Sequence, residues 1–206
     1  MTEPMKYGQT EFEVHLPPEL IAAELEPNQV DLPQRTTAEH IRWALDHPID
    51  SAPLKELVKA GDKVCVVISD VTRRWQAPDT YLPILIGELG GAGVRDEDIL
   101  ILSATGTHRR QTEEEHIGLV TKPVYDRIRV EDHVCTDQDN LAYVGTTSRG
   151  TPVWLDKRAL ACDKIILTGG VVYHFMAGFG GGRKSILPGI AGRETIMKNH
   201  NLALNP

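Results

Sequence analysis

The sequence at Lys63–Ser69 is KVCVVIS, and it lies between Gly61 and the polar stretch Asp70–Arg74. A continuous run of β-branched and other apolar residues is typical of a strand that is buried on both faces. Such strands belong to parallel sheets, because the crossover helices of a parallel sheet cover both of its faces. The stretch therefore predicts a parallel sheet at the centre of an α/β fold.

The alternation of helix and buried strand continues on the carboxyl side. The predicted segments are a helix over Pro78–Gly90, a strand over Ile99–Ser103, a helix over Thr112–Val120 that opens with a Thr112/Glu115 capping box, and a third buried strand over Lys164–Leu167. Shorter strands are predicted at Arg127–Val130, Leu141–Val144 and Val153–Leu155. Together these segments predict an α/β fold with a Rossmann-like, mostly parallel sheet and flanking helices.

The flanks of this core are predicted to be simpler. Residues 1–60 are expected to hold a first strand, Glu11–Leu16, a polar connector, Glu26–Gln34, and a helix that opens with a Thr36/Glu39 capping box. Residues 61–191 are expected to form the α/β core, and residues 192–206 a helix, from about Glu194 to Asn201. No closing strand follows this helix, so we expect the chain to end at a cut between domains.

The composition favours small molecules as partners. The net charge is −7 and the basic residues are scattered, so neither nucleic acid nor a membrane surface is expected to bind. No apolar run reaches about 18 residues, and the start lacks the build of a signal peptide, so a cytoplasmic protein is expected. The three cysteines occur singly, which indicates neither a disulfide framework nor a thiolate metal site.

Three predicted strands end in loops rich in Gly, Thr, Asp, Arg or His. These loops are Asp70–Arg74, Thr105–His108 and Gly169–Lys184. In open α/β sheets, ligands bind beyond the carboxyl ends of the strands, so the three loops are expected to meet at one edge. This edge is the predicted ligand site.

The densest chemical signal is the glycine-rich stretch Val171–Gly192. Closely spaced glycines let backbone N–H groups approach an anion, and Lys184 adds a charge or a nucleophilic amine. The stretch does not match the phosphate-binding P-loop, because Arg183 replaces its last glycine and Pro188 interrupts the helix that should follow.

The segment from His174 through GGGRKSILPG (180–189) to His200 resembles the cofactor segment of the nickel-dependent lactate racemase family. The turns Asp70-Val-Thr-Arg73 and Thr105-Gly-Thr-His108 resemble the same family in the same order. The similarity begins at Tyr7-Gly8 and extends to the end of the chain. Family members are longer, so the resemblance implies that residues 1–206 are the N-terminal domain of a two-domain enzyme.

The resemblance also implies a cofactor and roles for individual residues. The cofactor is a nickel(II) pyridinium-3,5-bisthiocarboxylate mononucleotide, the nickel pincer nucleotide, joined covalently to Lys184, with His200 as the nickel ligand. His108 and His174 correspond to the acid/base pair of a 2-hydroxyacid racemase or epimerase. The remaining matched positions, which contact the cofactor, are Asp70, Val71, Thr72, Arg73 and Pro188. The implied partners are a small 2-hydroxyacid and the proteins that make and insert the cofactor.

This chemistry agrees with the residue types. Removal of hydride from the unactivated C2–H bond requires loss of the hydroxyl proton, and the two enantiomers present that hydroxyl from different directions. One base on each side is the simplest arrangement, and histidine has a suitable pKa near neutral pH. Arg73 or Arg74 could hold the substrate carboxylate.

Several simpler interpretations of these residues also agree with the sequence. His108, His174 and His200 could bind zinc in a hydrolase or lyase, although their spacing is unlike that of a compact zinc site. The chain could bind the cofactor without activity if a second domain completes the substrate site, and Lys184 could be an ordinary anion-binding lysine. Asp70 and Thr72 could cap the helix that starts near Pro78. The histidines expected to be structural are His40, His47, His116 and His133.

Overall fold

The computed structural model describes residues 2–8, 10–26 and 28–204. The chain forms two compact units, Met1–Gln34 and Arg35–Pro206. Residues 35–60, which the sequence grouped with the first strand, are therefore part of the larger unit. Each unit is described by itself.

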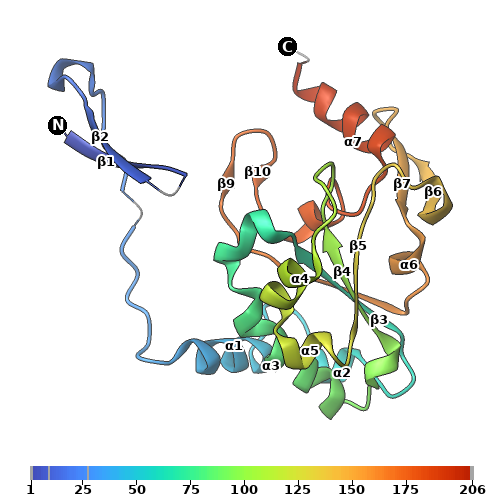
Figure 1. The fold of residues 1–206 in the computed structure, drawn as a ribbon. Coiled ribbons are helices and arrows are strands. Elements are labelled where there is room, and N and C mark those ends of the chain that lie inside the picture. Colours follow the sequence, from blue (N-terminus) through green and yellow to red (C-terminus); the bar gives the residue numbers. More distant parts are fainter. Residues whose placement is uncertain (1, 9, 27, 205–206) are drawn as a thin grey trace. The chain divides into compact units, whose positions relative to one another are not determined.

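The smaller unit is a β-hairpin followed by an extended segment (Figure 1). Strands β1 (Thr2–Tyr7) and β2 (Thr10–His15) pair antiparallel, with Met5 opposite Phe12. A 3-10 turn, η1 (Pro18–Leu20), follows them. The predicted strand Glu11–Leu16 corresponds to β2, whereas β1 was not predicted. The described part of the connector Glu26–Gln34 contains no helix or strand.

The larger unit is built on a four-stranded sheet in the order β5-β4-β3-β8. All three pairings are parallel, and Val64 lies opposite both Ile99 and Lys164. The strands are β3 (Val64–Ser69), β4 (Ile99–Ala104), β5 (Arg129–Asp132) and β8 (Lys164–Leu167). The predicted parallel α/β sheet is confirmed. The predicted strand Arg127–Val130 begins two residues later, at Arg129.

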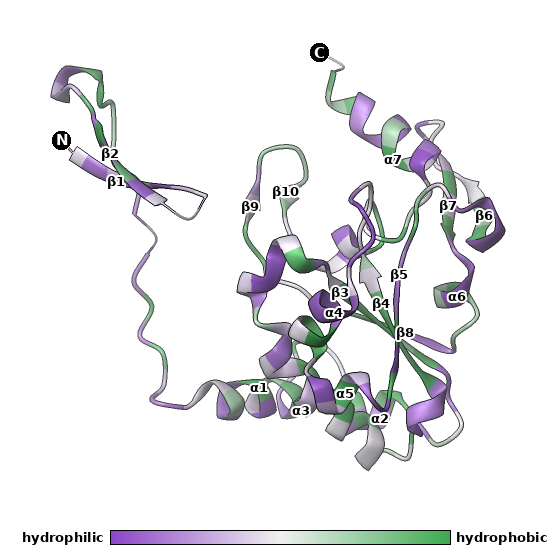
Figure 2. Cartoon of the chain, viewed as in Figure 1, coloured by the Kyte–Doolittle hydropathy of each residue, from purple (hydrophilic) through white to green (hydrophobic). Residues whose placement is uncertain are grey.

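Alternate side chains of β3 and β4 enter two core clusters, one on each face of the sheet. On the first face, Val64, Val66 and Ile68 pack with the apolar side of α3 (Pro78–Gly91) and with Leu119 and Val120 of α4 (Glu113–Val120). On the second face, Cys65 and Val67 pack with Leu102, Ala159 and Ile190. Figure 2 shows that the central strands are mostly hydrophobic. This double burial explains the continuous apolar runs of β3 and β4.

Strand β8 differs from the prediction of a third buried strand. Lys164 and Ile165 are exposed, and Ile166 and Leu167 are only partly buried. The reason is position, because within residues 28–204 β8 pairs with β3 alone and forms one edge of the sheet.

Both predicted capping boxes are confirmed. The Thr36 side chain accepts from the Glu39 backbone N–H at 3.3 Å, and the Glu39 carboxylate accepts from the Thr36 N–H at 2.7 Å, at the start of α1 (Thr37–Asp46). Thr112 and Glu115 repeat the arrangement at α4, with distances of 3.2 and 2.9 Å. These bonds satisfy N–H groups that the first helical turn leaves unpaired.

The remaining elements are short. The predicted strands near residues 141 and 153 form the hairpin β6 (Leu141–Thr146) and β7 (Pro152–Asp156), and the predicted terminal helix is α7 (Arg193–His200). The other helices and strands are α2 (Leu54–Leu57), α5 (Lys122–Tyr125), α6 (Lys157–Leu160), β9 (Tyr173–His174) and β10 (Gly178–Phe179). The other 3-10 turns are η2 (Val71–Gln76), η3 (Asp96–Asp98), η4 (Gln138–Asn140), η5 (Gly182–Ser185) and η6 (Asn201–Leu204).

A buried histidine ties β7 and the segment before α7 to the sheet. His133 follows β5, its side chain is 0% exposed, its Nδ1 lies 2.9 Å from Asp156 Oδ2, and its Nε2 lies 2.9 Å from the Ala191 carbonyl oxygen. His116 pairs with Asp132 at 2.9 Å. Both contacts agree with the structural roles expected for these histidines.

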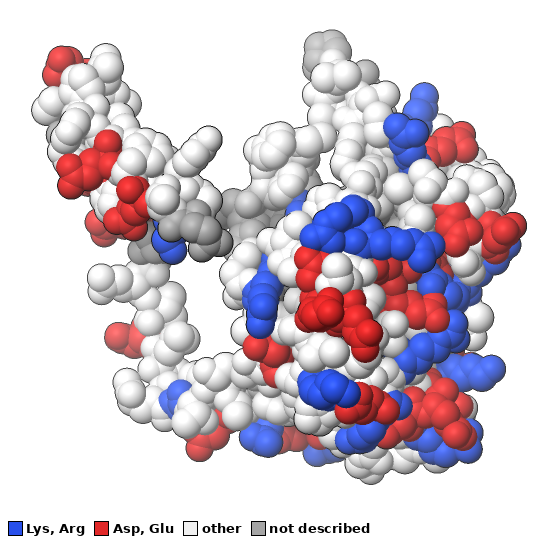
Figure 3. Space-filling view, viewed as in Figure 1, with Lys and Arg blue, Asp and Glu red and all other residues white. Residues whose placement is uncertain are grey.

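Among the described residues, no helix has the length and apolar character needed to cross a membrane. Acidic and basic side chains are interspersed over the larger unit in the view of Figure 3.

Candidate active site

A pocket of about 290 Å³ lies at the carboxyl ends of β3 and β4. Figure 1 shows β4 pointing toward the end of the unit where the β9–β10 hairpin and α7 lie. The pocket lies between the loops after β3 and β4 on one side and the glycine-rich segment on the other, as predicted for three loops at one sheet edge. Six of the predicted site residues line it: Arg73, His108, His174, Lys184, Pro188 and His200.

The turn Asp70–Thr72 supports the pocket from behind and does not line it. The Asp70 side chain is 2% exposed and accepts hydrogen bonds from the Thr72 N–H at 3.2 Å, from the Thr72 hydroxyl at 2.5 Å and from His108. Val71 packs against the core, and its N–H donates to Gln111 Oε1 at 2.7 Å. Of this predicted cofactor turn, only Arg73 reaches the pocket.

Asp70 does act as a cap, but not of the helix near Pro78. Its side chain caps η2, the 3-10 turn that begins at Val71. The residue before α3 is Ala77, which has φ 52° and no side-chain capping bond. The expectation that Asp70 and Thr72 cap α3 is therefore wrong, because η2 separates them from that helix.

Two hydrogen bonds fix the start of the loop after β4. The buried Thr105 donates its hydroxyl to the His133 carbonyl oxygen at 2.5 Å, and the Gly106 N–H donates to the Gly189 carbonyl oxygen at 3.0 Å. Gly106 has φ 56°, which favours glycine. These bonds hold the His108 loop against the segment that carries Pro188.

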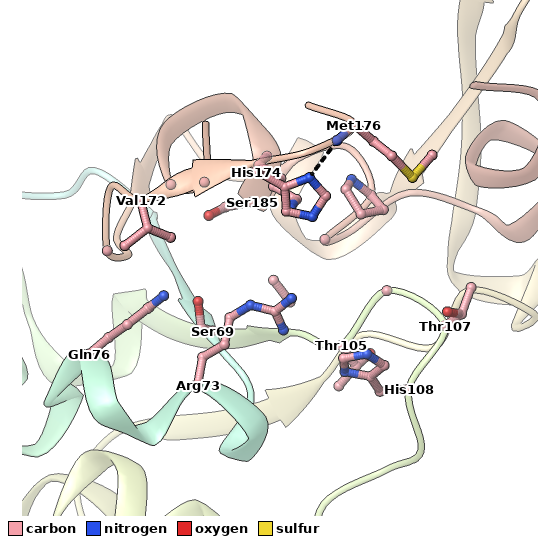
Figure 4. A pocket seen from close by; sticks show the side chains of 18 of the residues that line it. Ser69, Arg73, Gln76, Thr105, Thr107, His108, Val172, His174, Met176 and Ser185 are labelled. Atoms are coloured by element: carbon pink, nitrogen blue, oxygen red, sulfur yellow. Dashed lines mark hydrogen bonds between the residues drawn. The ribbon is translucent and has the colours of Figure 1, made fainter. Parts of the chain in front are cut away.

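His174 faces the pocket from the β9–β10 hairpin. Its Nδ1 accepts hydrogen bonds from the Met176 and Ala177 N–H groups, each at 3.2 Å. In Figure 4, His174 lies on one side of the cavity, and Arg73 and His108 lie on the other. Desolvation lowers the pKa of His174, and the positive charges of Lys184, Arg73 and His200 lower it further. A lowered pKa favours neutral imidazole, which can take part in proton transfer.

Lys184 lies in η5, two residues after the last of the glycines at 180–182. Desolvation lowers the pKa of its amine, and the Arg73 guanidinium lowers it further. A Cβ at Gly181 would lie 3.1 Å from the Gly170 carbonyl oxygen, so glycine at this position allows the two ends of the loop Gly169–Lys184 to approach each other. No Asp or Glu side chain lines the pocket among the residues that the structure describes. Its charged lining is therefore basic, which suits an anionic ligand.

His200 lines the pocket from the last turn of α7. Nowhere in the described chain do three or more His, Cys, Asp or Glu side chains form a group that could hold a metal ion. The zinc alternative, which needs such a set, has no support in this geometry.

Some of the residues that line the pocket were not among the predicted site residues. Ser69, Trp75 and Gln76 line the cavity near Gly170, and a Cβ at Gly170 would come within 2.8 Å of the Trp75 ring. The Gln76 Oε1 atom is buried without a hydrogen-bond partner within the described residues. Ser69 could have been inferred from its place at the end of β3, whereas the direction of the Gln76 side chain depends on the irregular turn η2.

Comparison with known proteins identifies similar sequences. The sequence model of a family described as the lactate racemase N-terminal domain matches residues 7–206. Lactate racemase of Lactiplantibacillus plantarum is 37% identical over 164 residues, which are 79% of this chain and 38% of the relative. Lactate racemase of Thermoanaerobacterium thermosaccharolyticum is 31% identical over 195 residues, 94% of this chain and 45% of the relative. The chain thus spans less than half the length of these relatives.

Solved structures show the same likeness. The lactate racemase apoprotein of Thermoanaerobacterium thermosaccharolyticum superposes with a TM-score of 0.78 at 31% identity, covering 96% of this chain and 45% of that chain. A protein from Thermotoga maritima superposes with a TM-score of 0.65 at 28% identity, covering 81% of this chain and 41% of that chain.

Proposed function

Because the chain belongs to the lactate racemase family, whose N-terminal domain it spans, we propose that it forms the cofactor-binding part of a racemase or epimerase of 2-hydroxyacids. The observation that carries this proposal is the meeting of Lys184, His200, His108 and His174 around one pocket. These residues come from η5, α7, the loop after β4 and the β9–β10 hairpin, so the fold itself brings them together.

The donor set of the pocket fits a nickel pincer nucleotide. Lys184 supplies an amine whose pKa is lowered, which is the group needed for covalent attachment, and His200 supplies an imidazole, which suits nickel. Arg73, Gly180 and Gly181 line the pocket and suit the negative charge of a nucleotide. Pro188 lines the same wall, so it can contact the bound group directly. When bound, the cofactor supplies an electrophilic site that takes hydride from C2 of the substrate.

The protein side chains bind the substrate and move its hydroxyl proton. Arg73 is the guanidinium that reaches the cavity, so it is the group that we assign to the substrate carboxylate. Arg74 lies close to Gly118 of α4 and does not line the pocket. His108 and His174 lie on opposite sides of the cavity, as a pair of bases that serves two enantiomers requires (Figure 4).

The proposal predicts the fate of the substrate hydrogen. With lactate that carries deuterium at C2, the racemised product formed by the loaded protein in ordinary water should keep its deuterium, because hydride transfer does not exchange with solvent. His108→Ala and His174→Ala should each lower kcat by about 10²–10⁴-fold, the usual contribution of a general acid or base. Loss of the deuterium to solvent would contradict hydride transfer.

The longer relatives have a C-terminal part that lies outside residues 1–206, and the test must take that part into account. If the loaded chain alone does not react, a longer version that carries the corresponding C-terminal part should be assayed beside it. Activity of the longer version alone would support the alternative of a fragment that binds cofactor without activity. Inactivity of both loaded proteins toward a panel of 2-hydroxyacids would contradict the proposed reaction. The panel also identifies the substrate, and we propose that the proteins that make and insert the cofactor are the chain's other partners.

A further inference from the structure

The two pocket histidines use their Nδ1 atoms in opposite ways. His108 Nδ1 lies against Asp70 Oδ2, and a carboxylate oxygen accepts a hydrogen bond. His174 Nδ1 faces the N–H groups of Met176 and Ala177, which can only donate (Figure 4). The first nitrogen must therefore carry a proton, and the second must offer its lone pair.

The carboxylate that faces His108 is held firmly in place. Asp70 is buried after β3, and its Oδ1 is occupied by the Thr72 N–H and hydroxyl, which leaves Oδ2 for His108. The following residue, Val71, is fixed through its N–H to Gln111, whose side-chain amide donates to Asp132 at 2.8 Å. The carboxylate cannot turn away from His108 without breaking these bonds.

The donors that face His174 belong to the tip of its own hairpin. The pairs His174–Gly178 and Tyr173–Phe179 close the β9–β10 hairpin, and residues 175–177 form the turn. The turn points two N–H groups at Nδ1, and the Phe175 ring stacks on the imidazole at 5.0 Å between centroids and 12° between planes. The positive groups Lys184, Arg73 and His200 are the charges that act on this imidazole, and all three oppose a second proton on it.

We propose that His108 and His174 are held in opposite neutral tautomers, with Asp70 as the positioning residue for His108. His108 then carries its proton on Nδ1 and presents the Nε2 lone pair to the pocket. His174 carries its proton on Nε2 and presents an N–H. The pocket is therefore polarised before any ligand binds, with an acceptor on one wall and a donor on the other.

The two tautomers add detail to the proposed function. Their assignment stands without that function, and only their roles in proton transfer rest on it. His108 is set to take the hydroxyl proton of the enantiomer whose hydroxyl faces its Nε2, and the proton it gains there produces an imidazolium that faces Asp70. His174 is set to donate a hydrogen bond to an oxygen of the substrate. Reaction in the other sense requires a lone pair at His174 Nε2, and thus a change in the Met176–Ala177 turn.

The tautomers can be measured without cofactor or activity. In the ¹⁵N-labelled chain at about pH 8.5, above the ordinary imidazole pKa of about 6.5, long-range ¹H–¹⁵N spectra distinguish protonated from unprotonated ring nitrogens. Signals are assigned with His108→Gln and His174→Gln. We expect a protonated Nδ1 in His108 and a protonated Nε2 in His174. The same tautomer in both residues, or averaged signals from either, would overturn the proposal.

A pair of matched variants isolates the role of Asp70. Asp70→Asn keeps the shape of the side chain but can present an N–H to His108, so the protonated nitrogen of His108 should change from Nδ1 to Nε2 while His174 stays unchanged. Asp62→Asn is the control, because Asp62 is also a buried carboxylate, but it accepts from the Lys59 N–H at 3.1 Å and takes no part in the bonds around Asp70. An unchanged His108 in a folded Asp70→Asn variant would remove Asp70 from the role. If that variant does not fold, the wild-type spectrum still decides whether the tautomers are opposite.

The outcomes separate this inference from the proposed function. Opposite tautomers in a chain that binds no nickel cofactor would leave the inference standing and contradict the function. If both histidines hold the same tautomer in a nickel-loaded protein that racemises 2-hydroxyacids, the proposed function stands and this inference is contradicted.

Discussion

Lys184 and Arg73 line the same pocket, and this neighbourhood should change the reactivity of the lysine. Desolvation and the Arg73 charge both disfavour the ammonium form, so the pKa of Lys184 lies below its usual value of about 10.4. Competitive acylation followed by peptide mass spectrometry should therefore show Lys184 gaining reactivity at lower pH than Lys198, which is exposed on α7. Arg73→Gln should move the Lys184 profile toward higher pH.

The control for this prediction is Arg183→Gln. Arg183 adjoins Lys184 in sequence, but the charge that lowers the Lys184 pKa is that of Arg73. A Lys184 profile that is the same in wild type and Arg73→Gln, or one that Arg183→Gln shifts just as far, would contradict the assigned cause.

A second residue-scale prediction concerns acid stability. Burial alone raises the pKa of Asp156, but hydrogen bonds from Arg158 and His133 outweigh it and lower the pKa to about 2. Because the folded pKa is below the unfolded value of about 3.9, the stabilisation is complete above about pH 4 and is lost as the pH falls through 2. Urea unfolding should show that Asp156→Asn removes roughly 2 kcal/mol of the acid dependence of the unfolding free energy.

The control for acid stability is Asp96→Asn. Asp96 pairs with Arg127 on the surface, where water screens the interaction, so its removal should change the acid dependence far less. Equal effects of the two substitutions would show that burial of the Asp156 cluster is not the cause.

At the residue scale, the sequence predicted the residues that line the pocket better than the residues that hold them in place. His108, His174, Lys184 and His200 meet as expected, because loops after parallel strands share one sheet edge. Asp70 and Thr72 were predicted as cofactor contacts from the resemblance alone, and the sequence did not show that Asp70 accepts from both Thr72 and His108. Which way a turn side chain points depends on long-range partners such as Gln111, and no local pattern shows them.

At the scale of elements, the close packing of the segment after η5 depends on one glycine, Gly189. A Cβ at Gly189 would lie 2.1 Å from the Ser185 carbonyl oxygen and 2.8 Å from Ala104 Cβ. Gly189→Ala should push this segment away from the end of β4 and cost about 1–3 kcal/mol in the free energy of unfolding. Because the Gly189 carbonyl oxygen accepts from the Gly106 N–H, the His108 loop should also shift.

Gly87→Ala is the matched control for this substitution. Gly87 lies within α3, and a Cβ there would meet nothing within 4 Å. The substitution should stabilise the protein by up to about 1 kcal/mol, because alanine loses less conformational freedom in a helix. Chemical denaturation measures both variants, and a Gly189→Ala protein as stable as wild type would contradict the close approach at residue 189.

The elements themselves were predictable where local signals are strong. Apolar runs located β3 and β4, and capping boxes located the starts of α1 and α4. Strand β1 was not predicted because TEPMKY is polar and contains proline, and its partner β2 is what identifies it. The prediction that β8 is buried was wrong, because an apolar run does not indicate whether a strand lies at the edge of a sheet.

At the scale of the whole molecule, the four-stranded sheet supports a pocket of basic and neutral groups in a chain of net charge −7. The parallel direction of the strands follows from the alternation of strands and helices along the sequence, whereas the order β5-β4-β3-β8 was not predicted. The division into two units at Gln34 could not be predicted in this way, because α1 and α2 pack with α3 of the larger unit. Residues far apart in the sequence thus decide where a unit ends.

The most direct test of the central claim, that this pocket holds a nickel cofactor on Lys184, is the intact mass and metal content of the protein produced together with the cofactor-making enzymes. We predict a covalent mass increase of cofactor size with nickel bound in wild type, loss of both in Lys184→Ala, and retention of both in the control Lys198→Ala. An unmodified wild-type mass without nickel, or an adduct that persists in Lys184→Ala, would contradict the claim.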